Sequence, residues 1–107
     1  MSIDTITKYK QSDATLDYVV DLASLLNGNG YSNYLDSGET IYSATAASTG
    51  DITISAAEII NDATSVRVWL SGGTVGTTYT VSITVQTTMT SGAYRRQDVF
   101  DFNVKCI

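Results

Sequence analysis

Carboxylates are the residues through which this chain could act as an acid or base, because its 107 residues hold eleven of them and no histidine. Without histidine, a serine or cysteine nucleophile lacks its usual base and zinc lacks its usual nitrogen ligand. Of the two close pairs, Asp17/Asp21 shares the solvent face of a strand and Asp98/Asp101 faces opposite ways. Neither pair sets two acids across a cleft, as glycoside hydrolysis requires. We predict no catalytic residue and a protein that is not an enzyme.

Oxygen ligands for a cation gather in the segment from Asn27 to Glu39. The Asp-x-Asp-x-Asp-Gly order of a helical calcium loop is absent from it, and no phosphate-binding glycine motif occurs elsewhere. We therefore predict no metal and no cofactor, and leave calcium or a glycan at this loop as open alternatives. The ligand-bearing residues are Asn27, Asn29, Asn33, Asp36 and Glu39.

Composition predicts one small all-β domain. Hydrophobic residues make up 43% of the chain and charged residues 16%, and the β-branched and aromatic types that suit a pleated sheet are abundant. The net charge of −5 repels a phosphate backbone, so we expect no nucleic-acid partner. The polar start of the chain and the lack of a long apolar run predict no signal peptide and no membrane. The single cysteine, Cys106, falls on the apolar face of the last strand and is expected to be a buried thiol.

Apolar alternation with a period of two predicts about seven strands. Because no parallel βαβ pattern appears, we expect an immunoglobulin-like antiparallel β-sandwich with one or two short helical turns, spanning residues 14–107 behind an N-terminal arm of residues 1–13. The predicted strands are Leu16–Leu22, Thr40–Ala46, Asp51–Ile54, Ser65–Leu70, Thr78–Thr87 and Asp98–Cys106, with Leu16, Tyr18, Val20 and Leu22 on the buried face of the first.

Local signals between the strands predict turns. Ala23–Leu26 could form one helical turn, and the Ser-x-x-Glu form of Ser55–Glu58 favours either a helical turn over Ala56–Asn61 or an irregular crossover there. The glycines after Leu70 indicate a sharp turn. Tyr79 follows it, either as a core residue or with its hydroxyl bonded back to that corner. Thr88–Arg95 is expected to be the polar tip of a hairpin.

Exposed aromatic and loop residues are the candidates for partner binding, because aromatic and arginine side chains dominate interface hot spots. By strand alternation Trp69 faces away from the core, where it is either an anchor for a partner or covered by the segment Ala56–Asn61. The predicted partner-binding residues are Tyr31, Asn33, Tyr34, Leu35, Trp69, Met89, Tyr94 and Arg95.

A resemblance to a known family adds to these observations. The run Val68–Val81, VWLSGGTVGTTYTV, together with Leu16–Leu22 and Gly38–Ile41, resembles small structural proteins of tailed bacteriophages, of the fibre–tail adaptor or head-decoration type. The resemblance covers roughly residues 15 to 106. The chain departs from it by an inserted segment at Asn29–Ser37 and by a longer last hairpin.

The resemblance implies a non-enzymatic virion protein made in the host cytoplasm. Its partners would be capsid, connector or tail proteins, and it would be a homo-oligomer or be present in many copies. The alternative is a carbohydrate-binding or adhesin module in which Tyr31, Tyr34 and Tyr94 stack on sugars.

Overall fold

The computed structural model of the chain describes residues 8–25 and 33–107. Within these residues it contains seven strands and one short 3₁₀ turn, η1, at Leu22–Ser24. The strands are β1 (Lys8–Lys10), β2 (Leu16–Asp21), β3 (Ile41–Ser48), β4 (Ile52–Ile60), β5 (Ser65–Gly72), β6 (Thr78–Ser91) and β7 (Tyr94–Cys106). The all-β prediction is therefore confirmed.

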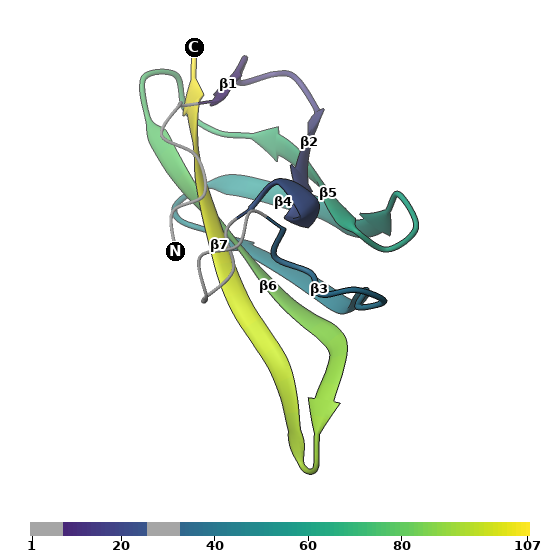
Figure 1. Cartoon of the computed structure of the whole chain (residues 1–107). Coiled ribbons are helices and arrows are strands. Elements are labelled where there is room, and N and C mark those ends of the chain that lie inside the picture. Colours follow the sequence, from purple (N-terminus) through teal and green to yellow (C-terminus); the bar gives the residue numbers. More distant parts are fainter. Residues whose placement is uncertain (1–7, 26–32) are drawn as a thin grey trace.

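The strands form two sheets that pack face to face as a sandwich (Figure 1). One sheet has the order β1-β7-β6-β3 and the other β2-β5-β4. The orders β7-β6-β3 and β2-β5-β4 are those of strands G-F-C and B-E-D in immunoglobulin sandwiches, although membership of that fold stays a prediction. Pairing is antiparallel except at β1, which runs parallel to β7.

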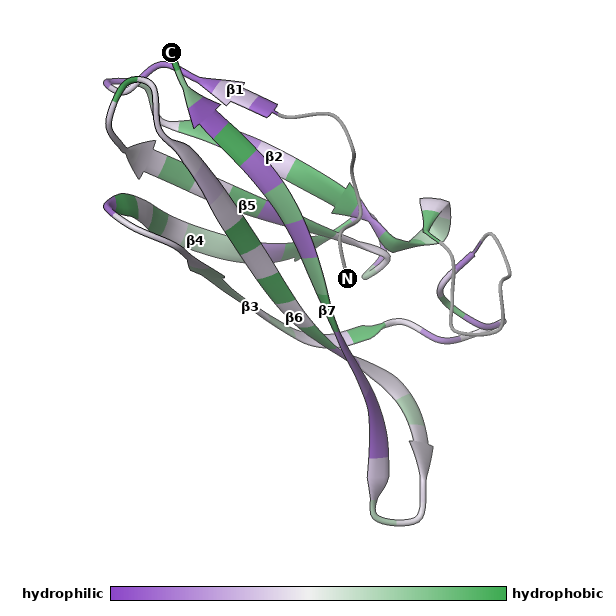
Figure 2. Ribbon diagram, turned by 90° about the vertical axis from the view of Figure 1, so that its left-hand side faces the viewer, coloured by the Kyte–Doolittle hydropathy of each residue, from purple (hydrophilic) through white to green (hydrophobic). Residues whose placement is uncertain are grey.

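The core lies between the sheets and follows from strict alternation along the central strands. In β6 every second residue from Tyr79 to Thr87 is buried, and the residues between them are half-buried. Figure 2 shows this alternation as bands of hydrophobic and paler colour along β5 and β6. Beside them in the same sheet, β7 contributes Phe100, Phe102 and Val104, and the opposite sheet contributes Val20, Val66, Val68 and Leu70 from β2 and β5.

The segment after Ile54 is a strand, so both predictions for Ala56–Asn61, a helical turn and an irregular crossover, were wrong. β4 continues to Ile60 because it pairs with β5 along its length. The residues of the supposed capping box bond across the sheet: Ser55 contacts Ser71 at 3.3 Å, and the Trp69 indole donates to Glu58. Long-range pairing thus outweighs the local capping signal.

The other differences from the predicted elements are smaller. The helical turn expected at Ala23–Leu26 is η1, where Asp21 accepts a bond from the Ala23 N–H at 3.0 Å. Leu16, expected in the core, is 41% exposed at the start of β2. Thr88–Arg95 is the tip of a hairpin, as predicted, but its strands are longer than expected, because β6 continues to Ser91 and β7 begins at Tyr94.

Three residues of the expected N-terminal arm, Lys8–Lys10, form β1 and belong to the sheet. Lys10 is 1% exposed, and its ammonium donates to the carbonyls of Gln11 at 2.8 Å and Gly72 at 2.7 Å. It pairs in register with Cys106, whose thiol is fully buried as the sequence predicted. Met1–Thr7 lies outside the described residues.

The corner between β5 and β6 is held by Tyr79. Its hydroxyl accepts the Thr74 N–H at 2.7 Å and donates to the Asp51 carboxylate, so the bond back to the corner is present. At Gly73 φ is +100°, and a Cβ would lie 2.5 Å from the Cys106 sulfur. Glycine is required at this position because no side chain fits there.

Candidate functional site

Three connections meet at one end of the sandwich, which we call the loop end: residues 33–40 before β3, the turn 61–64 between β4 and β5, and the hairpin between β6 and β7. Backbone bonds join them. The Ile41 N–H donates to the Ala63 carbonyl at 2.8 Å, and the Thr88 N–H donates to the Thr40 carbonyl at 2.8 Å. The connections therefore form one surface.

The hairpin extends beyond the sandwich as an arm, Thr88–Arg95 (Figure 1). It turns tightly through Gly92-Ala93, with Gly92 at φ +60°, as the first position of a type II′ turn requires. All eight of its residues are exposed, and Tyr94 reaches 82%. Figure 2 shows mostly pale and hydrophilic colours over this part of the chain. The arm is a projecting element that the core does not cover.

Irregularities in two strands lie at the base of the arm. Three residues of β6, Thr87–Met89, face the single residue Arg96 of β7 between regular pairs. On β3 the register shifts at Tyr42, which is 59% exposed and lies under the Arg95 guanidinium at 3.8 Å from the ring centre. Bulges bend a strand and re-aim its side chains. Here they mark the point where the arm leaves the sheet.

A buried ion pair ties the arm base to residues 33–40. The side chain of Glu39 has no exposed surface; it pairs with Arg96 at 2.9 Å and accepts a bond from the buried Thr87 hydroxyl. The other donor to this carboxylate is the Asp36 N–H at 2.8 Å. Arg96 also reaches the Tyr34 carbonyl at 3.4 Å. A buried carboxylate needs such partners, so the arm base and the loop are locked to each other.

Of the loop residues expected at the surface, some are buried and one is exposed. Tyr34 is 4% exposed, with its ring edge-on to Phe100 at 5.0 Å, and Leu35 is 7% exposed. Both therefore belong to the core. Asn33 is exposed, and its carbonyl oxygen accepts the Leu35 N–H at 3.0 Å. Tyr31 lies outside the described residues.

Burial also changes the chemistry of Tyr34. Its removal from water, with the nearby Asp98 carboxylate as the next cause, raises the pKa of the hydroxyl from 10.0 to about 12. A sugar-stacking role needs an exposed ring face, which Tyr34 does not offer. The carbohydrate-binding alternative thus loses one of its three tyrosines.

Met89, Tyr94 and Arg95 come together on the arm, whereas Trp69 does not join them. Trp69 is half-buried on the outer face of the other sheet, in register with Asp17 of β2 and Ala56 of β4. Its indole N–H donates to Glu58. Trp69 is therefore neither a fully exposed anchor nor a covered residue, because β4 lies beside the ring without covering it.

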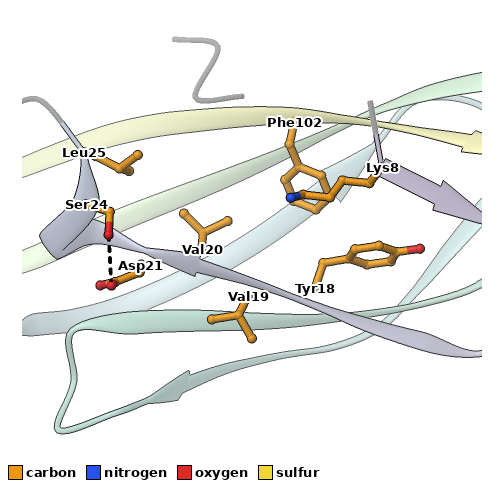
Figure 3. A pocket seen from close by; sticks show the side chains of 8 residues that line it. All are labelled: Lys8, Tyr18, Val19, Val20, Asp21, Ser24, Leu25 and Phe102. Carbon is orange, nitrogen blue, oxygen red and sulfur yellow. Dashed lines mark hydrogen bonds between the residues drawn. The ribbon is translucent and has the colours of Figure 1, made fainter. Parts of the chain in front are cut away.

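A pocket of about 230 Å³ opens between β2 and β7, away from the arm (Figure 3). Its lining is largely apolar. Asp21, the carboxylate in it, caps η1 by accepting bonds from Ala23 and Ser24. Its lining residues are Lys8, Tyr18, Val19, Val20, Asp21, Ser24, Leu25 and Phe102.

Within residues 8–25 and 33–107, no three acidic or cysteine side chains lie close enough together to hold a metal ion. The same residues contain no helix of the length and hydropathy needed to cross a bilayer. Of the oxygen ligands proposed for calcium, Glu39 is committed to Arg96 and Thr87.

Comparison with known proteins gives one decisive match. The family model described as "Podophage GP4 fiber-tail adaptor protein gp77" matches residues 10–104. The chain belongs to this family. The matched range contains β2 to β6 and all but the last two residues of β7, so the fibre–tail adaptor family accounts for both sheets and the arm. No curated protein and no solved structure matches the chain.

Sequence reasoning missed the residues that hold the arm. The sequence suggests Glu39 only as an oxygen ligand for calcium, and no local pattern singles out Arg96. Both faces of the strand predicted at Thr40–Ala46 carry small or polar residues, so the sequence does not show which way Tyr42 points. An acid and a base 57 positions apart give no local signal, so only the fold shows the pair.

Proposed function

We propose that this protein is a non-enzymatic virion component that joins tail and fibre proteins, and that it docks through the loop end with the arm as its main contact. The match to the fibre–tail adaptor family over residues 10–104 carries the proposal. The family is named for a fibre–tail adaptor, and an adaptor of this kind fits a structural role in the particle.

The geometry of the loop end supports a docking role. An arm of eight exposed residues is held at a fixed base by a buried ion pair and a cation–π contact. Because its base is held in place, the arm projects in a defined direction, which lowers the entropic cost of docking. Tyr94 and Met89 supply aromatic and thioether surface of the kind found in interface hot spots.

A phage that lacks this gene, complemented with variants, tests the proposal. In the test variant the arm Thr88–Arg95 is replaced by Asn-Gly, a sequence that closes a hairpin, while Thr87 and Arg96, which hold the Glu39 carboxylate, are kept. We expect a folded protein that is lost from purified particles. The matched control, Val75→Ser, changes an exposed residue at the opposite end of the sandwich and should be incorporated normally.

Particle composition decides between the outcomes. Loss of the shortened variant, with normal incorporation of Val75→Ser, supports docking through the arm. Equal incorporation of both variants would show that another surface docks. Absence of the unaltered protein from purified particles would overturn the virion role itself.

A further inference from the structure

We propose that the arm binds by strand addition: an extended, acidic segment of a neighbouring virion protein pairs with its exposed edge. This inference rests on the proposed function and names the chemistry of the partner. It follows from three properties of Thr88–Arg95, namely its open edges, its side-chain composition and its charge.

The edges of the arm are open for pairing. β3 pairs with β6 only as far as Thr87, the Thr88 N–H is used by the Thr40 carbonyl, and β1 pairs with β7 only at 104–106. Within the described ranges 8–25 and 33–107, no third strand therefore flanks residues 89–95 of the arm. A two-stranded ribbon is marginally stable in water by itself. A third strand would therefore stabilise this ribbon as well as bind to it.

The hairpin geometry identifies the backbone groups that would bind. Ser91 and Tyr94 close the two-residue turn, and Thr90 pairs with Arg95 next to them. In such a hairpin the two residues of the closing pair hydrogen-bond to each other. The N–H groups of the next pair therefore point outward, away from the partner strand. The Thr90 N–H therefore points away from β7, at the outer edge of β6. The Arg95 N–H points away from β6, at the outer edge of β7.

The side chains do not protect these edges. Natural edge strands are blocked by lysine, proline or inward-pointing charges. The arm instead consists of Thr88, Met89, Thr90, Ser91, Gly92, Ala93, Tyr94 and Arg95. Its one charged residue, Arg95, lies back over Tyr42 and donates to the Thr87 carbonyl at 2.9 Å. The backbone of the tip remains accessible.

The charge of the arm selects the partner. Arg95 forms no ion pair with any described residue, whereas the neighbouring Arg96 is paired with Glu39 and Asp36. Arg95 is also the one charged residue of the arm, so the local charge there is positive. A second copy pairing arm to arm would bring its own Arg95 to this edge, while an acidic segment of another protein would bring a carboxylate to it. Charge complementarity therefore favours a hetero-partner over self-association.

A binding assay on particles assembled without this chain tests strand addition. The labelled full-length protein is sedimented with such particles, and the bound fraction gives the affinity. Thr90→Pro removes the outward N–H, and Thr90→Ala keeps it with a similar loss of side chain. We expect Thr90→Pro to weaken binding about tenfold or more, and Thr90→Ala to change it less than about threefold.

Hydrogen exchange provides a readout that does not depend on a variant. If a strand is added, amide exchange in the peptide covering Thr88–Arg95 slows about tenfold or more on particle binding. If the arm contacts its partner through side chains alone, these amides exchange as in the free protein. The second result would overturn strand addition even if Thr90→Pro were misfolded.

Salt dependence tests the acidic character of the partner. Arg95→Gln should weaken binding at low salt, and its affinity should decline less steeply than that of the unaltered chain between about 50 and 200 mM salt. Arg67→Gln removes the same charge from the other sheet, where Arg67 pairs with Asp17, and should leave the decline unchanged. An unchanged decline in Arg95→Gln would exclude an acidic segment.

These experiments distinguish a failure of the proposed function from a failure of strand addition. If the unaltered chain does not bind the particles, the proposed function fails and this inference fails with it. If it binds and Thr90→Pro binds equally with unprotected arm amides, the virion role stands and strand addition is wrong. If the purified chain instead forms arm-dependent dimers, the occupant of the edge is a second copy and the hetero-partner is wrong.

Discussion

Side-chain hydrogen bonds of a few residues stabilise the end of the molecule opposite the arm. The Tyr79 hydroxyl joins the Thr74 backbone to Asp51, three groups that come from β6, the β5–β6 corner and the turn before β4. The bonds from Tyr79 and then Thr74 hold the pKa of the Asp51 carboxyl below its ordinary value of 3.8. The corner is therefore sensitive to acid.

Acid should weaken the fold through Asp51. Because the pKa of Asp51 is lowered in the folded state, the stability that its ionised carboxylate contributes is fully present above the pKa of the unfolded chain. This stability is lost as the pH falls below about 4. Tyr79→Phe removes the main donor, so melting temperature should fall less steeply with acid in this variant than in the unaltered chain. Parallel melting curves across this pH range measure the effect; identical acid slopes would contradict it.

Phe102 tests the strand alternation on which the core was predicted. It is 3% exposed and lies beside the Tyr18 ring, with the two ring centres 5.9 Å apart. Phe102→Ala should lower the free energy of unfolding by about 3–5 kcal/mol, because it leaves a cavity between the sheets. Urea denaturation gives this value.

The control for Phe102 lies on the other face of the same strand. Val99 is 36% exposed, and Val99→Ala should change the free energy of unfolding by less than about 1 kcal/mol. Equal effects of the two substitutions would mean that β7 does not present Phe102 to the core.

At the scale of elements, the arm base contains two adjacent arginines in different environments. Arg96 pairs with the fully buried side chain of Glu39, whereas Arg95 lies on the exposed ring of Tyr42. Removing a partner from a buried charge is far more destabilising than removing a surface contact. The two positions should therefore respond differently to the same substitution.

Alanine substitution at each arginine measures this difference. Arg96→Ala leaves the Glu39 carboxylate buried and should lower the free energy of unfolding by about 3–5 kcal/mol. Arg95→Ala loses a cation–π contact and should lower it by about 0.5–1 kcal/mol. Chemical denaturation of both variants checks the order. An Arg95→Ala effect as large as that of Arg96→Ala would show that the pair does not anchor the arm.

Elements with strong alternation were predictable from the sequence, and those defined by distant pairing were not. β6 and β7 alternate over many residues, so their buried faces followed directly. β4 carries Ser55 and Glu58 in a helix-capping pattern, and only its pairing with β5 makes it a strand. β1 is three residues long, too short for any periodic signal.

The candidate site was predicted in part for the same reason. Tyr94, Met89 and Arg95 lie near a turn, and exposure near a turn is a local property. Tyr34 and Leu35 also lie in a loop, yet Phe100 and the arm base cover them. Burial of a loop residue depends on what packs over it, which no spacing in the sequence reveals.

At the scale of the whole molecule, the sandwich presents its two ends differently. One end is closed by the Tyr79 corner and the parallel pairing of β1 with β7. The other carries the loop end and the arm, and the molecule extends 45 Å along its longest axis against 24 and 23 Å across. Such a shape suits a protein of the fibre–tail adaptor family that reaches into a neighbour.

Imaging of the intact phage particle tests this account most directly. A reconstruction by electron cryo-microscopy that resolves backbone should place the chain between tail and fibre proteins. We predict that the arm, Thr88–Arg95, is buried there against an extended segment of a neighbouring protein, with the Tyr79 corner facing away. A chain whose arm points into solvent while the opposite end or the Trp69 face makes the contacts would contradict the central claim.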